Sequence, residues 1–433
     1  MNVRRFFALT VVAALMLTLV GCSGSAPAAK PAADPPAAAK QPETPVTITV
    51  WDFYGDSTPI KPLIPAFEKE FPNIKVKFEA VGWNGFWQKL PIAITNGDVP
   101  DVVTTGLMWA PEYKANGAYA DLVPLSGGKL NGKPFDEVLP KGSMDAAKDG
   151  NKVYGMAYDF DAYAFFYRQD LFEAAGIKEI PQTWEGLAEA LKKVSSAPNR
   201  YGLIVEPSWN GWDSYLYAWG GAFLDKDGKA ALNSPAAVDS LTFMQKMVKD
   251  GVATTWTPDT GDLVSLLKSG KAAAFINGPY MMGVLRTAAP EMAGKWRVAS
   301  LPKSKAFGSH IGGVHLSIMA KAKQPKEAWK FVEFLMRTEN QVHVWKSSGA
   351  APALLPALEH ADVVKGDPYF GNQAAISIFK EAIKQGTPNP TIAEWTSVAE
   401  QIGKAVQEVL VLNKDPKTVL TDYNDKVNKI LKK

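Results

Sequence analysis

Cysteine is almost absent from this chain of 433 residues, in which Cys22 is the only one. A single thiol cannot form an internal disulfide or a thiolate metal site. Histidine is also scarce, and His310, His315, His343 and His360 lack the close spacing of metal ligands. The sequence therefore excludes a disulfide-stapled scaffold, and it predicts no metal and no other cofactor.

An excess of charge of either sign is missing as well. The chain has 47 basic and 44 acidic residues, a formal net charge of +3. Loss of Arg4 and Arg5 with an N-terminal export signal would lower that charge to +1. A nearly neutral chain has no long-range attraction for a polyanion, so we expect no nucleic-acid partner.

The common catalytic motifs GxGxxG, HExxH and GxSxG do not occur. The segment 127–134 approaches a phosphate-binding loop, but Pro134 stands where a Mg²⁺-binding Ser or Thr belongs, which predicts a turn. An enzyme that acts on saccharides stays open, because Asp159, Asp161 and Glu206 could supply an acid–base pair. Spacing along the chain alone does not decide this point.

The N-terminus has the pattern of an export signal. Arg4 and Arg5 precede the apolar stretch 6–20, which is too short and wrongly flanked for a membrane span. Leu19 to Cys22 (LVGC) resembles a bacterial lipobox, in which the cysteine is acylated and becomes the first residue. We therefore predict a lipoprotein signal peptide over 1–21 and lipid attachment at Cys22. Residues 22–45 are rich in Ala and Pro, which predicts an extended tether.

A globular region begins at Val46. Alternating apolar residues predict strands over 46–51, 74–78 and 99–103, and helical spacing predicts helices between them. This order predicts a parallel sheet covered by helices. Ligands of such sheets lie beyond the carboxyl ends of the strands, which are residues 53–57 and 104–109 here.

The most informative stretch is 151–187. It predicts a strand over 154–158, a second, fully buried strand over 162–167, and a helix that Thr183 caps. Asp159 and Asp161 separate the two strands. Residues two apart in extended chain point to the same side, so both carboxylates are expected to face one surface.

This stretch resembles the family 1 extracellular solute-binding proteins of ABC importers, the maltose-binding-protein-like group. The resemblance rests on Tyr167-Arg168-Gln169-Asp170-Leu171, then Gly176, then Pro181-Gln182-Thr183-Trp184. Arg168 stands where the family usually has Asn or Asp. Matching segments in the same order extend the resemblance from Val46 to Leu431.

The resemblance implies a bilobal α/β fold, with a helix-flanked central sheet in each lobe and hinge segments between the lobes. One lobe would comprise 46–159 and 307–358, and the other 160–306 and 359–433, with a hinge at Asp159–Asp161. The implied function is capture of a mono- or oligosaccharide in the cleft between the lobes and its delivery to the membrane permease. A polyol or a glycerol phosphate is an alternative ligand. The protein would be an exported monomer, lipid-anchored at the outer face of the cytoplasmic membrane or in the periplasm.

The candidate ligand residues combine aromatic rings with polar side chains. Sugar rings stack their apolar faces on aromatic side chains and exchange hydrogen bonds at their rims. The resemblance and the predicted strand ends together select Tyr54, Asp56, Met108, Trp109, Asp161, Glu206, Trp209, Tyr280, Gly313 and Trp395. Trp395 is expected to line the cleft, so that Trp395→Ala weakens binding but leaves the fold intact.

Replacement of Cys22 by Ala tests the lipid anchor. The variant should leave the membrane fraction or keep its signal peptide, because it lacks the thiol that carries the acyl chains. Membrane fractionation and metabolic labelling with a fatty acid measure this. Cys22→Ala with unchanged fractionation and unchanged labelling would contradict the prediction.

Overall fold

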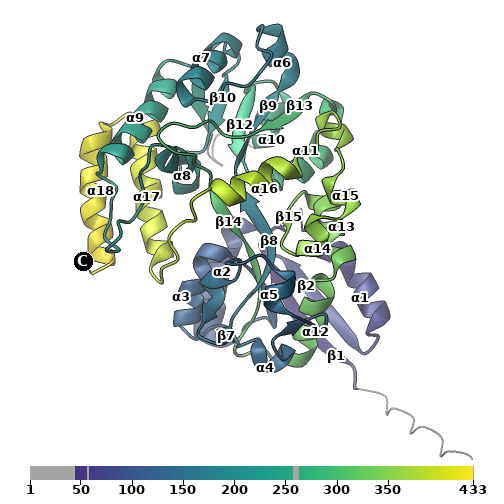
Figure 1. Ribbon diagram of the computed structural model, residues 1–433. Coiled ribbons are helices and arrows are strands. Elements are labelled where there is room, and N and C mark those ends of the chain that lie inside the picture. Colours follow the sequence, from purple (N-terminus) through teal and green to yellow (C-terminus); the bar gives the residue numbers. More distant parts are fainter. Residues whose placement is uncertain (1–43, 56–57, 257–262, 433) are drawn as a thin grey trace, which may run out of the picture. The chain divides into compact units, whose positions relative to one another are not determined.

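The computed structural model describes residues 44–55, 58–256 and 263–432 (Figure 1). The predicted signal peptide, nearly all of the tether and Asp56 lie outside the described residues, so their assignments stay predictions. None of the helices in these described ranges is both long and apolar enough to cross a membrane.

The first half of the globular region forms most of a six-stranded sheet of order β15-β8-β14-β3-β1-β2. Its strands are β1 (Val46–Asp52), β2 (Ile74–Ala80), β3 (Val102–Gly106), β8 (Met156–Ala162), β14 (Ile311–Ile318) and β15 (Ala351–Pro352). As predicted, β1 is parallel to both β2 and β3. The sheet as a whole is mixed, however, since β14 joins it antiparallel to β3 and β8.

Helices on this sheet bury an aromatic contact between distant parts of the chain. Phe67 is fully buried, and its ring centroid lies 4.9 Å from that of Phe331 and 5.4 Å from that of Phe334. The helical elements that follow these strands in the first half are α1 (Ile64–Glu70), α2 (Trp83–Asn96), η3 (Leu107–Trp109), α3 (Ala110–Ala115), α4 (Val123–Ser126) and α5 (Phe135–Val138). Phe331 and Phe334 come from α12 (Pro325–Leu335), which ties the later segment to the first sheet.

A second, five-stranded sheet has the order β11-β10-β12-β9-β13. Its strands are β9 (Ala164–Arg168), β10 (Leu203–Val205), β11 (Ala253–Thr255), β12 (Ala274–Asn277) and β13 (Trp296–Ala299). Phe166 of β9 stacks on Phe275 of β12 at 4.8 Å between ring centroids, and both are buried. The predicted α/β fold, with two sheets that are each flanked by helices, is confirmed (Figure 1).

The predicted helix cap at Thr183 is present, and Ser234 caps a second helix. Thr183 accepts a hydrogen bond from the backbone N–H of Gly186, and Ser234 accepts one from Ala237, which satisfies backbone donors that a helix start leaves free. The α-helices after β9, apart from α12, are α6 (Gln169–Ala174), α7 (Trp184–Val194), α8 (Trp209–Ala218), α9 (Pro235–Lys249), α10 (Leu263–Lys268), α11 (Met281–Ala288), α13 (Thr338–Ser348), α14 (Leu355–Leu358), α15 (Ala361–Val364), α16 (Ile376–Gln385), α17 (Trp395–Leu410) and α18 (Pro416–Ile430).

The change from one sheet to the other falls at Tyr163. β8 stays in the six-stranded sheet to Ala162, and β9 begins in the other sheet at Ala164. The expectation that Asp159 and Asp161 separate two strands was wrong, because both lie within β8. Strand pairing uses backbone groups and does not require apolar side chains, so two acidic residues do not end this strand. The lobe boundaries themselves stay a prediction.

Candidate functional site

Tryptophan rings connect the two sheets. Trp109 follows β3 in the short helix η3, and its ring stacks on Trp87 at 4.2 Å. On its other side, Trp109 lies edge-on to Trp209 of α8, with 6.3 Å between ring centroids. Trp209 in turn lies 5.1 Å from Trp395 of α17. Three aromatic residues predicted from separate segments are therefore brought together.

Local backbone features place these rings. A Cβ on Gly106 would lie 2.6 Å from the ring of Trp109, so glycine lets the indole fold back against the end of β3. Ser208 caps α8 by accepting from the backbone N–H of Gly211 at 3.2 Å. That cap makes Trp209 the first residue of the helix. Trp395 likewise begins α17.

The candidate side chains at this position differ in their exposure to solvent. Trp209 is half-buried, Met108 and Trp109 are buried, and Trp395 has no exposed surface. Because this side chain packs between Trp209 and Phe223, we expect its loss to destabilise the fold, contrary to the expectation from the sequence. Its contact with a ligand stays a prediction.

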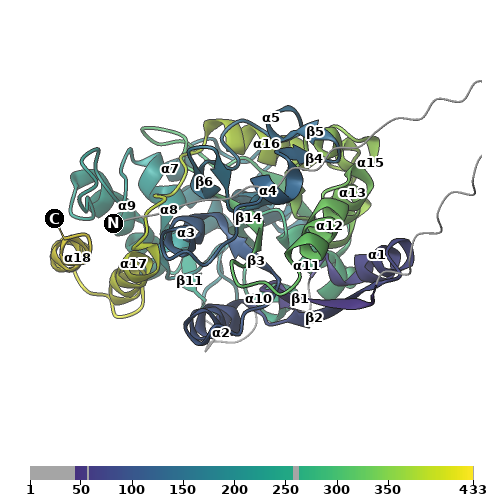
Figure 2. The same cartoon turned by 90° about the horizontal axis from the view of Figure 1, so that it is seen from below.

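The two sides of the site also touch through polar side chains. Thr396 of α17 donates a hydrogen bond from Oγ1 to Glu112 Oε2 of α3 at 2.5 Å. Figures 1 and 2 both show α3 next to α17. This bond and the contact between Trp109 and Trp209 join η3 and α3, which follow β3 of the six-stranded sheet, to α17 and α8 on the side of the five-stranded sheet.

Two acidic residues of β8 also belong to the candidate site. Asp159 is 3% exposed, and it accepts a short hydrogen bond from the Tyr54 hydroxyl. Burial raises the pKa of Asp159 to about 7; the Tyr54 bond opposes this and the charge of Asp161 adds to it. Burial also raises the pKa of Asp161 to about 6, against the opposing effect of His310. A hydrogen-bond donor would therefore favour the ionised form of either carboxyl group.

The five-stranded sheet contributes a third carboxylate. Glu206 directly follows β10, and burial raises its pKa above the ordinary value. Tyr280 stands before α11 and donates from its hydroxyl to Asn277 Oδ1 at 2.5 Å. Burial, then Asp161, then Glu206 raise the pKa of Tyr280, which indicates that both carboxylates lie near this phenol.

A buried ion pair lies next to the site. His310 Nδ1 lies 2.6 Å from Asp213 Oδ2. Asn389 Nδ2 donates to the same oxygen at 3.0 Å, and the Tyr217 hydroxyl donates to Asn389 at 2.6 Å. Burial alone would lower the pKa of His310, but Asp213 raises it above the ordinary value. The ring of Tyr163, where the chain changes sheets, lies 4.5 Å from that of His310.

The sequence did not reveal this network. His310 and Asp213 are 97 residues apart, and Asn389 is 176 residues from Asp213. No short motif spans such separations, and a lone His carries little signal by itself. Across the described ranges, no group of three or more potential metal ligands is formed.

Gly313 stands where two strands approach closely. Its φ is +149°, and an added Cβ would lie 2.5 Å from the carbonyl oxygen of Asp159. The glycine lets β14 approach β8 closely at a register shift that follows Val314. Whether Gly313 also contacts a ligand stays a prediction.

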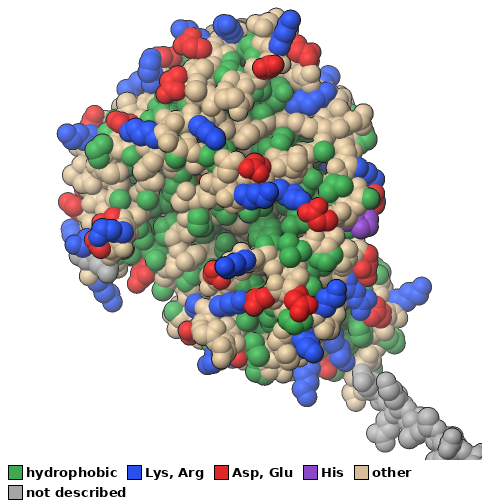
Figure 3. Space-filling view, in the orientation of Figure 1, with side chains coloured by type: hydrophobic (Ala, Val, Ile, Leu, Met, Phe, Trp, Pro, Cys, Tyr) green, Lys and Arg blue, Asp and Glu red, His purple; other side chains and the backbone are tan. Residues whose placement is uncertain are grey.

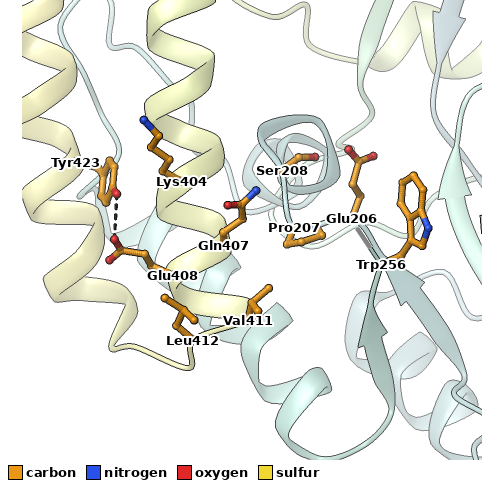
Figure 4. Close-up of a pocket in the computed structure, with 10 residues that line it drawn as sticks. All are labelled: Glu206, Pro207, Ser208, Trp256, Lys404, Gln407, Glu408, Val411, Leu412 and Tyr423. Atoms are coloured by element: carbon orange, nitrogen blue, oxygen red, sulfur yellow. Dashed lines mark hydrogen bonds between the residues drawn. The ribbon is translucent and has the colours of Figure 1, made fainter. Parts of the chain in front are cut away.

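A groove of about 570 Å³ adjoins Glu206 (Figure 4). Its lining residues are Glu206, Pro207, Ser208, Trp256, Lys404, Gln407, Glu408, Val411, Leu412 and Tyr423. Figure 4 shows Gln407 extending from α17 toward Ser208, with Glu206 and Trp256 at the opposite end from Tyr423. The groove thus runs from a predicted ligand residue toward α18.

Comparison with known proteins decides the family. The family model described as bacterial extracellular solute-binding protein matches residues 54–342. The chain belongs to this family. The match begins at Tyr54 and spans Trp109, Asp161, Trp209 and Tyr280, and it confirms the resemblance seen in the sequence.

Individual relatives cover nearly the whole chain. A putative binding protein of Brucella abortus is 28% identical over 90% of this chain and 93% of its own length. A maltooligosaccharide ABC transporter solute-binding lipoprotein of Streptococcus pneumoniae is 26% identical over 94% of this chain and 92% of its own. The GacH receptor of Streptomyces glaucescens, solved unliganded and with acarbose, has a TM-score of 0.80 at 24% identity, covering 90% of this chain and 99% of its own. These relatives are named as binding proteins or receptors, not as enzymes.

Asp159→Asn should change how folding stability depends on pH. Because the pKa of Asp159 rises from 3.8 to about 7 on folding, its protonated form is favoured in the folded state. The stability that this proton contributes is fully present below the unfolded pKa of 3.8, and it is lost as pH rises through the folded pKa of about 7. The variant should therefore gain stability relative to the parent between pH 4 and pH 8, by at most about 4 kcal/mol at roughly 1.4 kcal/mol per pKa unit.

Urea denaturation at several pH values measures the difference. Asp136→Asn is the matched control, since that side chain is 86% exposed. A constant difference between Asp159→Asn and the parent over the whole range would contradict the assigned pKa shift.

Trp209→Ala and Trp395→Ala should separate binding from folding. Trp209→Ala should weaken ligand binding roughly tenfold, since an aromatic contact contributes on the order of 1–2 kcal/mol. Trp395→Ala should instead lower the free energy of unfolding by about 3–5 kcal/mol, because it leaves a cavity in a closed core. Calorimetry and urea denaturation measure the two effects. Trp51→Ala, in the half-buried outer part of β1, controls for loss of an indole.

Proposed function

We propose that this chain is the substrate-binding lipoprotein of an ABC importer and that it captures a carbohydrate between its two sheets. One observation carries the proposal. The rings of Trp109 and Trp209, which belong to opposite sides of the site, lie 6.3 Å apart, and Trp209 lies 5.8 Å from His310, whose charge acts on Asp161. Asp161 Oδ1 has no hydrogen-bond partner among the described residues. Family membership and a relative named for maltooligosaccharides support it.

The residues suit the chemistry of a sugar. Indole rings can cover the apolar face of a pyranose ring. Asp161 and Glu206 can accept hydrogens from neighbouring hydroxyls, and Asn277 and Tyr280 offer further polar atoms close by. Such a site holds a polyhydroxylated ligand without covalent chemistry.

Delivery follows from the proposed anchor. Acylation of Cys22 would hold the protein at the outer face of the cytoplasmic membrane or in the periplasm, and the tether would let the body reach the permease. The lobes would rotate about the segments that link the sheets and enclose the ligand. In this proposal the lobes comprise 46–159 with 307–358 and 160–306 with 359–433, and the β8–β9 link at Tyr163 serves as one hinge.

A saccharide-cleaving enzyme is the second candidate that the sequence left open. A glycosidase places two carboxyl groups on either side of the bond that it cleaves. Asp159 is instead held by the Tyr54 hydroxyl on the same strand as Asp161. This arrangement argues against Asp159 and Asp161 as an opposed pair, and relatives named as binding proteins favour binding over cleavage.

Calorimetry with neutral mono- and oligosaccharides, combined with analysis of the same solutions for cleavage products, tests the function. We expect saturable binding, a raised melting temperature in thermal-shift assays, and no product. Product formation would favour the enzyme. Absence of binding across the panel would contradict carbohydrate capture.

Ligand should also make the protein more compact. If lobe rotation encloses the sugar, the radius of gyration from small-angle scattering should fall on saturation. A ligand-free chain that already holds the contact between Thr396 and Glu112 would show a smaller change, so Thr396→Ala serves as a comparison that loosens the free state. Equal radii with and without ligand in both proteins would argue against closure.

A further inference from the structure

From the charges around this site we infer that the chain selects uncharged or amine-bearing ligands and rejects anionic ones, with Asp161 and Glu206 as the residues that determine this specificity. The inference rests on the proposed function and refines its ligand class. It argues against the glycerol phosphate alternative, because a phosphate needs positively charged partners.

Three carboxylates converge on the site from both sheets. Asp159 and Asp161 come from β8 of the six-stranded sheet, and Glu206 follows β10 of the five-stranded sheet. The charges of Asp161 and Glu206 both raise the pKa of Tyr280. The charge of Asp161 also raises the pKa of Asp159. Gly278 lies between two of these residues, since an added Cβ would be 1.8 Å from Asp161 Oδ1 and 3.0 Å from the ring of Tyr280. Asp161 and Tyr280 are therefore neighbours, and the charge of Glu206 reaches the same phenol.

Counter-charges are missing from that region. In the described part of the chain, neither Lys nor Arg is among the main influences on the pKa of Asp159, Asp161 or Glu206. His310 is the one cation that acts on Asp161, and it is already paired with Asp213 at 2.6 Å. At least one carboxylate charge thus stays without a positive partner.

The adjoining groove does not supply the missing charge. Lys404, the cation among its lining residues, forms an ion pair with Glu400 at 2.6 Å. Glu408, on the same side, pairs with Lys414 at 2.9 Å. Both lysines thus already have an acidic partner.

Asp161 is also short of hydrogen-bond donors. Its Oδ1 is buried and accepts no bond from any described residue. The same oxygen lies against Gly278, where an added Cβ would approach it to 1.8 Å. A carboxylate oxygen in this state is stabilised by an incoming hydroxyl or ammonium hydrogen. A phosphate or a sugar acid brings oxygens that repel it.

This selectivity would be local, not a property of the whole surface. The formal net charge is +3, which would attract anions weakly, if at all. Figure 3 shows basic and acidic side chains interspersed over the face in view. Rejection of anions therefore has to come from the site itself, where burial keeps salt from screening the charges.

Matched pairs of neutral and anionic ligands test the inference. Glucose is compared with glucuronate and phosphorylated glucose, maltose with phosphorylated maltose, and glycerol with glycerol phosphate; glucosamine adds a cationic member. We expect a neutral or amine-bearing member to bind, and its anionic counterpart to bind about tenfold more weakly or worse, because like charges a few ångströms apart repel strongly at an intermediate dielectric. The difference should persist at high salt.

Removal of the charge on Asp161 or Glu206 should reduce the difference in affinity between neutral and anionic ligands. Asp161→Asn keeps the size of the side chain, so the affinity ratio of neutral to anionic ligand should fall several-fold. Glu206→Gln provides a second, independent variant, so that a folding defect in one leaves the comparison intact. Glu381→Gln removes a carboxylate whose side chain is 54% exposed on α16 and should leave the ratio unchanged.

The outcomes separate this inference from the function on which it rests. Binding of sugars together with equal or tighter binding of their anionic counterparts overturns the inference but keeps carbohydrate capture. A ratio that neither Asp161→Asn nor Glu206→Gln changes overturns the role of these two residues. Binding by no member of the panel overturns both proposals.

Discussion

Strands β8 and β14 pair antiparallel over Met156–Ala162 and Ile311–Ile318, and the remaining architecture depends on this contact. β8 leads through Tyr163 directly into β9 of the other sheet. The segment before β14 carries His310 to the same place, where Tyr163 N–H donates to its carbonyl oxygen at 3.2 Å. The two links between the sheets are therefore held side by side at the point where Asp159 and Asp161 stand.

This position explains why polar groups are buried there. A buried carboxylate without a counter-charge destabilises the folded state, and Asp159, Asp161 and Glu206 all show the raised pKa that follows from burial. Such a cost persists where the side chains serve a ligand. The network of His310, Asp213 and Asn389 differs, because its members satisfy one another and so hold the links between the sheets without needing a ligand.

Aromatic packing and charge divide the work of the site. The rings of Trp87, Trp109 and Trp209 pack together, and in the proposed function they would cover the apolar face of a sugar. The uncompensated carboxylates would then restrict which charged substituents that sugar can carry. Shape and charge would thus select the ligand independently. A change among the aromatic residues should leave the preference for ligand charge unaltered, and a change among the carboxylates should leave the ring contacts unaltered.

Local patterns in the sequence were enough for much of this protein. Strands β1, β2 and β3, the capped helices α7 and α9, and the family itself follow from short-range periodicity, caps and motif order, which depend on neighbouring residues. The aromatic residues Trp109, Trp209 and Trp395 could be selected in the same way, since each stands at the end of a strand or the start of a helix. What only the tertiary structure decided were contacts between distant segments. These include the antiparallel entry of β14, the continuation of β8 through its two aspartates, the full burial of Trp395 and the pairing of His310 with Asp213. Burial and pairing are properties of the space around a side chain, and that space is filled by residues that local sequence does not reveal.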